Sequence, residues 1–125
     1  MNYKISIPKI AVILYFIMFI YSGIMKIVKY NKKVETLTKK TGLPYPINDL
    51  GMIGVILLEI FGSLIVVYHF WGGKINQKIV KYVLYTFMLF LIVVTPLYHP
   101  PTKNIIPFLA NITTFGGLLF IYNLI

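Results

Sequence analysis

The chain has 125 residues, of which 58% are hydrophobic and 12% charged, and it carries a net charge of +9 without any cysteine. Soluble domains are about half apolar and about a quarter charged, and a chain this short cannot bury such an apolar excess, so the composition predicts an integral membrane protein. All basic residues are lysines between the apolar runs, which is typical of basic flanks of membrane spans and argues against a nucleic-acid partner. The lack of cysteine excludes disulfides, thiol redox chemistry and thiolate metal ligands within this chain.

Four apolar runs are long enough to cross a bilayer, which takes about 20 helical residues. They cover residues 10–28, 50–71, 79–98 and 105–125. None alternates strictly as barrel strands do, and backbone groups in lipid must be satisfied internally, so helices are predicted. A cleaved signal peptide is disfavoured because the first apolar core continues to Ile27 without a small-residue cleavage site.

The connections predict how these spans are arranged. The turns between spans two and three and between spans three and four are short, so consecutive helices are expected to be antiparallel neighbours. The expected fold class is all-α: one four-transmembrane-helix antiparallel bundle over residues 1–125. With four spans, both termini are expected on the same side of the membrane.

The only sizeable polar segment is NKKVETLTKKTGLPYPIND, which separates the first two spans. Its VETLTKK part can form a short helix that ends at Gly42 and Pro44, the usual order of helix stop signals. An interfacial helix and a solvated loop both remain open. Tyr45 between two prolines suits the headgroup region in either case.

The second span carries an acidic residue, Glu59, near its middle. It lies nine residues past Leu50, so its Cα is about 14 Å along the helix and its short side chain is too deep to reach water easily. One helix face joins Glu59 to small and apolar residues: Gly51, Val55, Gly62 and Val66. Because the two glycines allow a neighbouring helix to come close, Glu59 is expected to face the bundle interior. Its carboxyl group is then either structural, as a hydrogen-bonding partner between helices, or functional.

The other spans bring polar residues toward the same half of the membrane. The first span ends with Ser22 and Lys26 on one face, and the third ends with Thr95 and His99 at the same spacing. The fourth span starts at that side and contributes one amide. The expected intramembrane polar cluster therefore contains Lys26, Glu59, His99 and Asn111.

Each further member of this cluster has a simpler interpretation. Lys26 can extend its long side chain along apolar surface to the headgroups. His99 precedes Pro100 and can mark the end of the third helix. Asn111 can join two helices by a hydrogen bond without binding any ligand.

Catalytic and metal sites are not predicted. The two histidines, His69 and His99, lie toward opposite faces of a core of about 30 Å and cannot ligate one haem within a single chain. No cluster has the ligand set of a metal site, and no nucleophile–base arrangement, phosphate loop or pair of carboxylates is present.

Four motifs in order, YSGIMKI, TGLPYPI, LLEIFGSLIVV and FLANITTFGGLLFIY, resemble the DoxX family of small four-helix membrane proteins. The family pattern ends helix one with a small residue, glycine and lysine, and has an acidic residue followed by small residues in helix two. The matching residues here are Ser22, Gly23, Lys26, Glu59, Gly62 and Ser63. In helix four the chain keeps Asn111, Gly116 and Gly117 but has Ala110 where the family often has lysine. The expected helix-packing positions are Ser22, Gly23, Gly51, Gly62, Gly116 and Gly117.

Members of this family have been linked to respiratory complexes, to a quinone-coupled sulfur oxidoreductase and to oxidative-stress assemblies. The resemblance implies a non-catalytic accessory or assembly component of a membrane complex, with the bilayer and other membrane proteins or further copies of the chain as partners. No cofactor is predicted under this interpretation. Two alternatives remain: a quinone-binding or proton-relaying subunit of a membrane oxidoreductase, and a small oligomeric pore.

Overall fold

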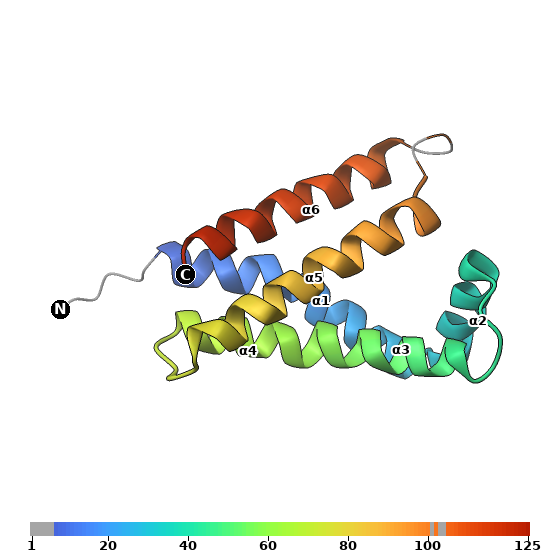
Figure 1. The fold of residues 1–125 in the computed structure, drawn as a ribbon, viewed down its shortest axis with the longest axis horizontal. Coiled ribbons are helices and arrows are strands. Elements are labelled where there is room, and N and C mark those ends of the chain that lie inside the picture. Colours follow the sequence, from blue (N-terminus) through green and yellow to red (C-terminus); the bar gives the residue numbers. More distant parts are fainter. Residues whose placement is uncertain (1–6, 101, 103–104) are drawn as a thin grey trace.

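The computed structural model describes residues 7–100, 102 and 105–125, and the regular structure in these residues is entirely helical (Figure 1). In chain order the elements are α1 (Ile7–Val28), α2 (Tyr30–Thr41), α3 (Ile47–Leu57), η1 (Leu58–Gly62), α4 (Ser63–Phe70), α5 (Gln77–Tyr98) and α6 (Ile105–Asn123). Because α3, η1 and α4 follow without a break, they form one helix over Ile47–Phe70. Within the described residues this helix, α1, α5 and α6 are long and apolar enough to span a membrane, which confirms the all-α, four-span prediction.

The helix bounds differ slightly from the predicted spans. The first three spans begin earlier than expected, at Ile7, Ile47 and Gln77, and the fourth ends earlier, at Asn123. Hydropathy marks only the apolar part of each helix, whereas capping residues carry the helix into the polar region. The side chain of Asn76, for example, accepts a hydrogen bond from the Lys78 amide at 2.9 Å and so starts α5.

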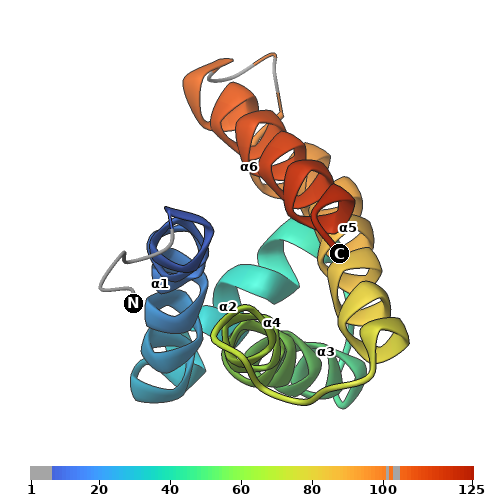
Figure 2. The ribbon, with the colours of Figure 1, turned by 90° about the vertical axis from the view of Figure 1, so that its left-hand side faces the viewer.

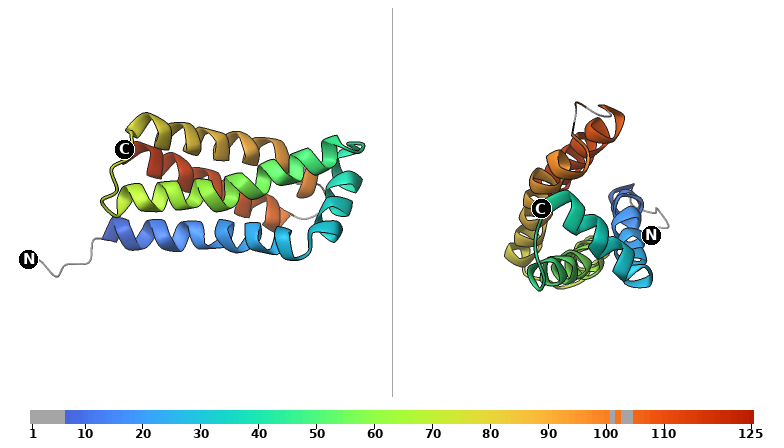
Figure 3. Two further views of the ribbon diagram at one scale, coloured as in Figure 1. Left: turned by 90° about the horizontal axis from the view of Figure 1, so that it is seen from below. Right: turned by 90° about the vertical axis from the view of Figure 1, so that its right-hand side faces the viewer.

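Consecutive spans run antiparallel and lie side by side (Figures 1 and 3). α1 lies against α3, η1 and α4; α4 lies against α5; and α5 lies against α6. α6 therefore sits at the outside of the bundle, away from α3 and α4 (Figure 2). Ile7 and Leu124 line the same groove, so α1 begins and α6 ends at one end of the bundle. α2 crosses the opposite end (Figure 1).

α2 is the short helix expected between the first two spans. It ends at Gly42, which has a φ of 73° and donates its N–H to the Thr38 carbonyl at 2.8 Å; this left-handed cap favours glycine. Two further hydrogen bonds hold α2 to the start of α3. The Tyr30 hydroxyl donates to the Asp49 carboxylate at 2.8 Å, and the Asn48 amide donates to the Thr38 hydroxyl at 3.0 Å. Of the two alternatives that the sequence left open, the structure has the short helix and not the loop, and this helix stops at Gly42 as expected.

The hydrogen bond to Asp49 raises the pKa of Tyr30 above its ordinary value, because the carboxylate stabilises the protonated phenol. This contribution to stability is complete below the ordinary tyrosine pKa of about 10 and is lost as the pH rises through the raised value. We expect the difference between the absorbance titrations of wild type and Tyr30→Phe to show one phenol that ionises above a pH of about 10. Asp49→Asn should return that phenol to the ordinary range. A difference curve unaffected by Asp49→Asn would contradict the assignment.

The core of the bundle is aromatic and joins α1 to α5. Phe16 and Phe19 from α1 and Phe87 from α5 are buried, with the ring centroid of Phe87 5.5 Å from that of Phe16 and 4.8 Å from that of Phe19. Many large apolar side chains instead cover the outside, among them Leu14 and Phe120. Such extensive apolar exposure is what contact with a lipid bilayer requires.

We expect Phe87→Leu to lower the free energy of unfolding by about 1 kcal/mol, because it removes two aromatic contacts while keeping most of the buried volume. Phe120→Leu is the matched control, since Phe120 is 67% exposed on α6. Equilibrium unfolding in mixed micelles measures both variants. Equal losses for the two variants would contradict the proposed role of the aromatic core.

Candidate functional site

The middle of the second span is not a regular α-helix. Residues Leu58–Gly62 form η1, a π-helical turn that contains Glu59. The hydroxyl of Ser63, one turn further on, donates to the Glu59 backbone carbonyl at 2.5 Å and so satisfies it within the protein. π-helical turns occur mostly as short insertions in α-helices and frequently at functional sites. Within this turn Glu59 is buried in the bundle, where the residue is 3% exposed.

The last turn of α1 supplies the partners of this carboxylate. Lys26 Nζ lies 2.9 Å from Glu59 Oε1, and Lys26 also donates to the Ser22 hydroxyl at 2.6 Å. The Ser22 hydroxyl in turn donates to the same Glu59 oxygen at 3.3 Å. Ser22 and Lys26 can act together because they lie four residues apart on one helix face.

The free energy of this ion pair depends on how deeply its two charges are buried. The Glu59 side chain is 4% exposed and that of Lys26 18% exposed, so both charges lie largely outside water. An unpaired charge at such a place is costly, whereas a paired and hydrogen-bonded one is tolerated. Lys26 is also at the C-terminal end of α1, where the helix dipole favours a cation. We name Ser22, Lys26 and Glu59 the polar triad.

Gly23 allows the two backbones to come close enough for the polar triad to form. A Cβ atom on Gly23 would lie 2.6 Å from Ile60 Cγ1 and 3.3 Å from Glu59 Cβ, so no larger residue fits without movement. Gly62 makes a similar approach toward α5, with Phe87 Cε2 at 3.0 Å from its Cβ position. The Cβ position of Gly117 meets the ring of Tyr15, where α6 approaches α1. Small residues at helix contacts are the usual means of close packing in membranes.

Two of the predicted packing glycines do not make such contacts. Gly116 is exposed, and apart from its own stretch of helix no described residue comes within 4 Å of its Cβ position. Gly51 is exposed and approaches only Leu37 of α2, at an ordinary distance of 3.9 Å. In the first half of the second span the buried residue is Met52, so the inward face lies one residue away from the predicted face. Met52 lies seven residues before Glu59, which returns to nearly the same face in a helix of about 3.6 residues per turn, whereas Gly51 lies eight residues before it and is turned about 80° away.

The predicted cluster of Lys26, Glu59, His99 and Asn111 is not one group. Asn111 of α6 donates its amide to the Thr95 hydroxyl of α5 at 3.1 Å and joins these two helices. His99 follows the end of α5 and lines a hollow at the end of the bundle. Asn111 does not reach Glu59 because α6 packs on the outer side of α5, away from the helix that carries Glu59.

We expect Thr95→Val to lower the free energy of unfolding by about 0.6 kcal/mol, the typical value for a side-chain hydrogen bond between membrane helices. Thr95 is buried, and valine has nearly the same shape as threonine. The loss of unfolding free energy therefore reports the hydrogen bond that Thr95 accepts from Asn111. Thr113→Val is the control, because the exposed Thr113 hydroxyl donates within its own helix, to the Leu109 carbonyl. A hydrogen-exchange or unfolding measurement that gives the two variants equal losses would contradict this assignment.

Sequence reasoning missed the contact between Tyr15 and α6. The Tyr15 hydroxyl of α1 donates to the Thr114 backbone carbonyl of α6, beside the approach of Gly117 to the tyrosine ring. A tyrosine in the middle of an apolar run is a weak signal, because its hydroxyl needs a partner once it lies in lipid or protein. The acceptor on α6 is a backbone carbonyl, which every residue has, so the sequence does not indicate which residue accepts this hydrogen bond.

A small cavity adjoins the polar triad. Its volume is about 130 Å³, and its wall includes Lys26 from α1, Met52 from α3, and Phe90 and Tyr98 from α5. Within the described residues, no three histidine, aspartate or glutamate side chains come together as metal ligands. Any small molecule bound next to the triad would therefore meet one ammonium group, the tyrosine side chain of Tyr98 and an otherwise apolar wall.

Comparison of the chain with known protein families, with curated proteins and with solved structures found no match. The class of the protein is accordingly defined by its own fold and by the site around Glu59. The chain is a small multi-pass membrane protein with four candidate spans, in which an ion pair is buried between the first two.

Proposed function

We propose that this chain is a DoxX-like membrane protein with both termini on the same side of the bilayer. It acts as a non-catalytic accessory or assembly component of a membrane complex. In this role the polar triad fixes the relative position of the first two spans. The protein then offers its apolar outer surface to other membrane proteins or to further copies of itself.

The Lys26–Glu59 pair carries this proposal. Each charge is satisfied inside the chain, at an N–O distance of 2.9 Å and with Ser22 bonded to both groups. A buried pair of this kind specifies one arrangement of two helices, because shifting either helix would separate the charges in a medium that does not solvate them. Such a role suits a scaffold, in which geometry rather than turnover is needed.

The position of α6 supports an accessory role. In its most apolar stretch only 11% of the residues are buried inside the protein, compared with 33% for α5. Its exposed side chains include Leu119 and Phe120. A helix held mainly by one neighbour leaves a wide apolar face for lipid or for another membrane helix.

The proposal is tested by purifying the tagged full-length chain from native membranes in a mild detergent. We expect another membrane protein to be recovered in a constant molar ratio to the tagged chain. We also expect Glu59→Gln to reduce the amount of assembled complex and the activity of that complex in parallel. Lys29→Gln, an exposed position beyond the end of α1, is the control. Recovery of the chain as a monomer without any partner would contradict the proposal. A Glu59→Gln complex that assembles fully but has lost a proton-dependent or quinone-dependent activity would contradict it as well.

The cavity beside Lys26 favours a second candidate, a quinone-binding subunit of a membrane oxidoreductase. An apolar cavity of about 150 Å³ accommodates benzene, so about 130 Å³ is of the order needed for one ring. Lys26 Nζ would then supply a hydrogen bond to a quinone oxygen. Organic extraction of the purified protein tests this directly: quinone present in wild type and absent from Lys26→Met would favour this candidate over the scaffold.

A further inference from the structure

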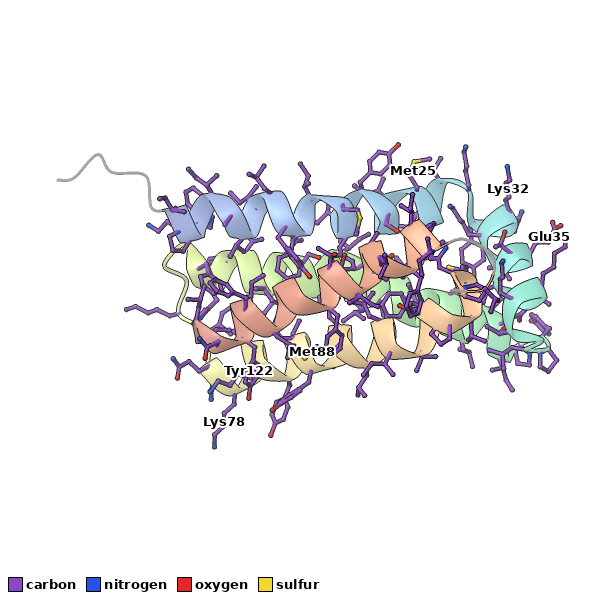
Figure 4. The ribbon with its side chains drawn as sticks, turned by 90° about the horizontal axis from the view of Figure 1, so that it is seen from above. Met25, Lys32, Glu35, Lys78, Met88 and Tyr122 are labelled. Atoms are coloured by element: carbon purple, nitrogen blue, oxygen red, sulfur yellow. The ribbon has the colours of Figure 1, made fainter. Side chains whose placement is uncertain are left out.

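α2 places a strongly basic surface across one end of the bundle. Its sequence, YNKKVETLTKKT, has four lysines and one glutamate. Lys32 and Glu35 project outward from this helix, at the opposite end of the molecule from Lys78 (Figure 4). Val34 and Leu37 of the same helix are half-buried, so α2 has one basic side and one apolar side, as helices that lie in a membrane interface do.

The end of this helix opens onto a hollow. The hollow has a volume of about 710 Å³ and is lined by Lys39 and Lys40 of α2, by Leu97 and Tyr98 of α5, and by His99 that follows α5. Two ammonium groups and an imidazole therefore surround a space whose inner wall is apolar and aromatic.

The acidic residue nearest to this charge does not neutralise it. Glu35 lies 3.2 Å from Lys39 Nζ, but both side chains are mostly exposed, and exposed pairs of this kind contribute little. Lys40 has no acidic side chain as a partner within the described residues. The hollow is thus positive and accessible.

We propose that this hollow binds the phosphate headgroup of an anionic phospholipid. Lys39 and Lys40 face the phosphate, His99 adds a hydrogen-bonding nitrogen, and the acyl chains run along Leu97 and the exposed apolar side chains of α5. A basic pocket at the ends of membrane helices is the usual setting for such headgroups.

The position of the hollow favours a lipid over a soluble phosphate compound. The hollow lies at the end of α5, where a span leaves the hydrocarbon region, and Tyr98 has the place of an interfacial aromatic residue. Leu97 is 39% exposed beside the two lysines, which gives an acyl chain apolar surface next to the charge. α2 cannot move away freely, because Tyr30 and Thr38 bond to Asp49 and Asn48 of α3.

The test uses the full-length protein in a neutral detergent, titrated with phosphatidylglycerol, phosphatidylcholine or inorganic phosphate. We expect phosphatidylglycerol alone to raise the unfolding temperature and to stay bound in native mass spectrometry. Because each lysine near a membrane surface strengthens such binding about fivefold, we expect Lys39→Gln/Lys40→Gln to weaken it about 25-fold. Lys39→Arg/Lys40→Arg should retain binding, since the charge is kept.

The matched control is Lys74→Gln/Lys78→Gln, which removes the same charge from two exposed positions. Lys78 lies at the other end of the bundle (Figure 4), and Lys74 lies in the connection that directly precedes α5 there. We expect this variant to bind phosphatidylglycerol within twofold of wild type. Equal weakening by both double variants would overturn the proposal, because it would mean diffuse charge attraction rather than a site. Equal stabilisation by inorganic phosphate would also overturn it, because the site would then recognise phosphate without the lipid. Unfolding without lipid checks that all variants are folded, and none of these outcomes depends on the role of the polar triad.

Discussion

We expect Lys26→Met to lower the free energy of unfolding by about 3 kcal/mol, because it leaves the Glu59 carboxylate buried without its cation. Glu59→Gln should cost less, about 1.5 kcal/mol, for two reasons. Its amide can still accept the hydrogen bond from Ser22, and the long side chain of Lys26, one turn from the end of α1, can turn toward the headgroups. Reversible unfolding in mixed micelles of a neutral detergent and dodecyl sulfate measures both values.

The double variant Lys26→Met/Glu59→Gln separates a specific pair from two independent losses. We expect it to be more stable than the sum of the single effects predicts, by about 1 to 2 kcal/mol, because neither charge remains unpaired. Lys29→Met is the control for loss of a lysine near the same helix end, and it should change the stability little because Lys29 is exposed. Strictly additive effects in this cycle would rule out the ion pair as a coupled unit.

The second large effect is expected at the close approach between α1 and η1. Gly23→Leu should lower the free energy of unfolding by about 2 to 3 kcal/mol, because its side chain would meet Ile60 and the Glu59 Cβ atom and push the two helices apart. Separation of the helices also lengthens the Lys26–Glu59 distance, so part of this loss should overlap with that of Lys26→Met. The same unfolding measurement applies.

Gly116→Leu is the matched control for this substitution. It makes the same chemical change within a membrane-spanning helix, at a position where a Cβ meets no atom within 4 Å. We expect its stability to equal that of wild type to within about 0.5 kcal/mol. A loss for Gly116→Leu as large as for Gly23→Leu would contradict the assignment, because the close approach at Gly23 would then not be the cause of its loss.

The pairing of Lys26 with Glu59 shows what sequence patterns can predict in a membrane protein. The i, i+4 spacing of Ser22 and Lys26 places both on one face, and the depth of Glu59 in its span makes a partner within the protein necessary. Few ionisable side chains lie within the apolar runs, so few pairings were available. The ion pair, which has an N–O distance of 2.9 Å, could therefore be anticipated from the sequence.

His99 and Asn111 show where such reasoning stops. Helical spacing predicts which residues share a face and at what depth they lie, but it does not say which neighbouring helix that face meets. α6 packs against α5 on its outer side, so Asn111 bonds to Thr95 and not to the polar triad. His99 lies beyond the last turn of α5 and faces the lysines of α2 instead.

The amino-acid sequence by itself determined the class of this protein, because composition, run length and the absence of alternation leave only membrane-spanning helices as a solution. It also indicated the stop signal at Gly42, which is local, but it left a short helix and a solvated loop both open before that residue. Only the tertiary structure decided the π-helical turn at Glu59 and the different roles of Gly23 and Gly116. These features depend on how neighbouring helices pack against one another, and the energy of that packing comes from residues far apart in the chain.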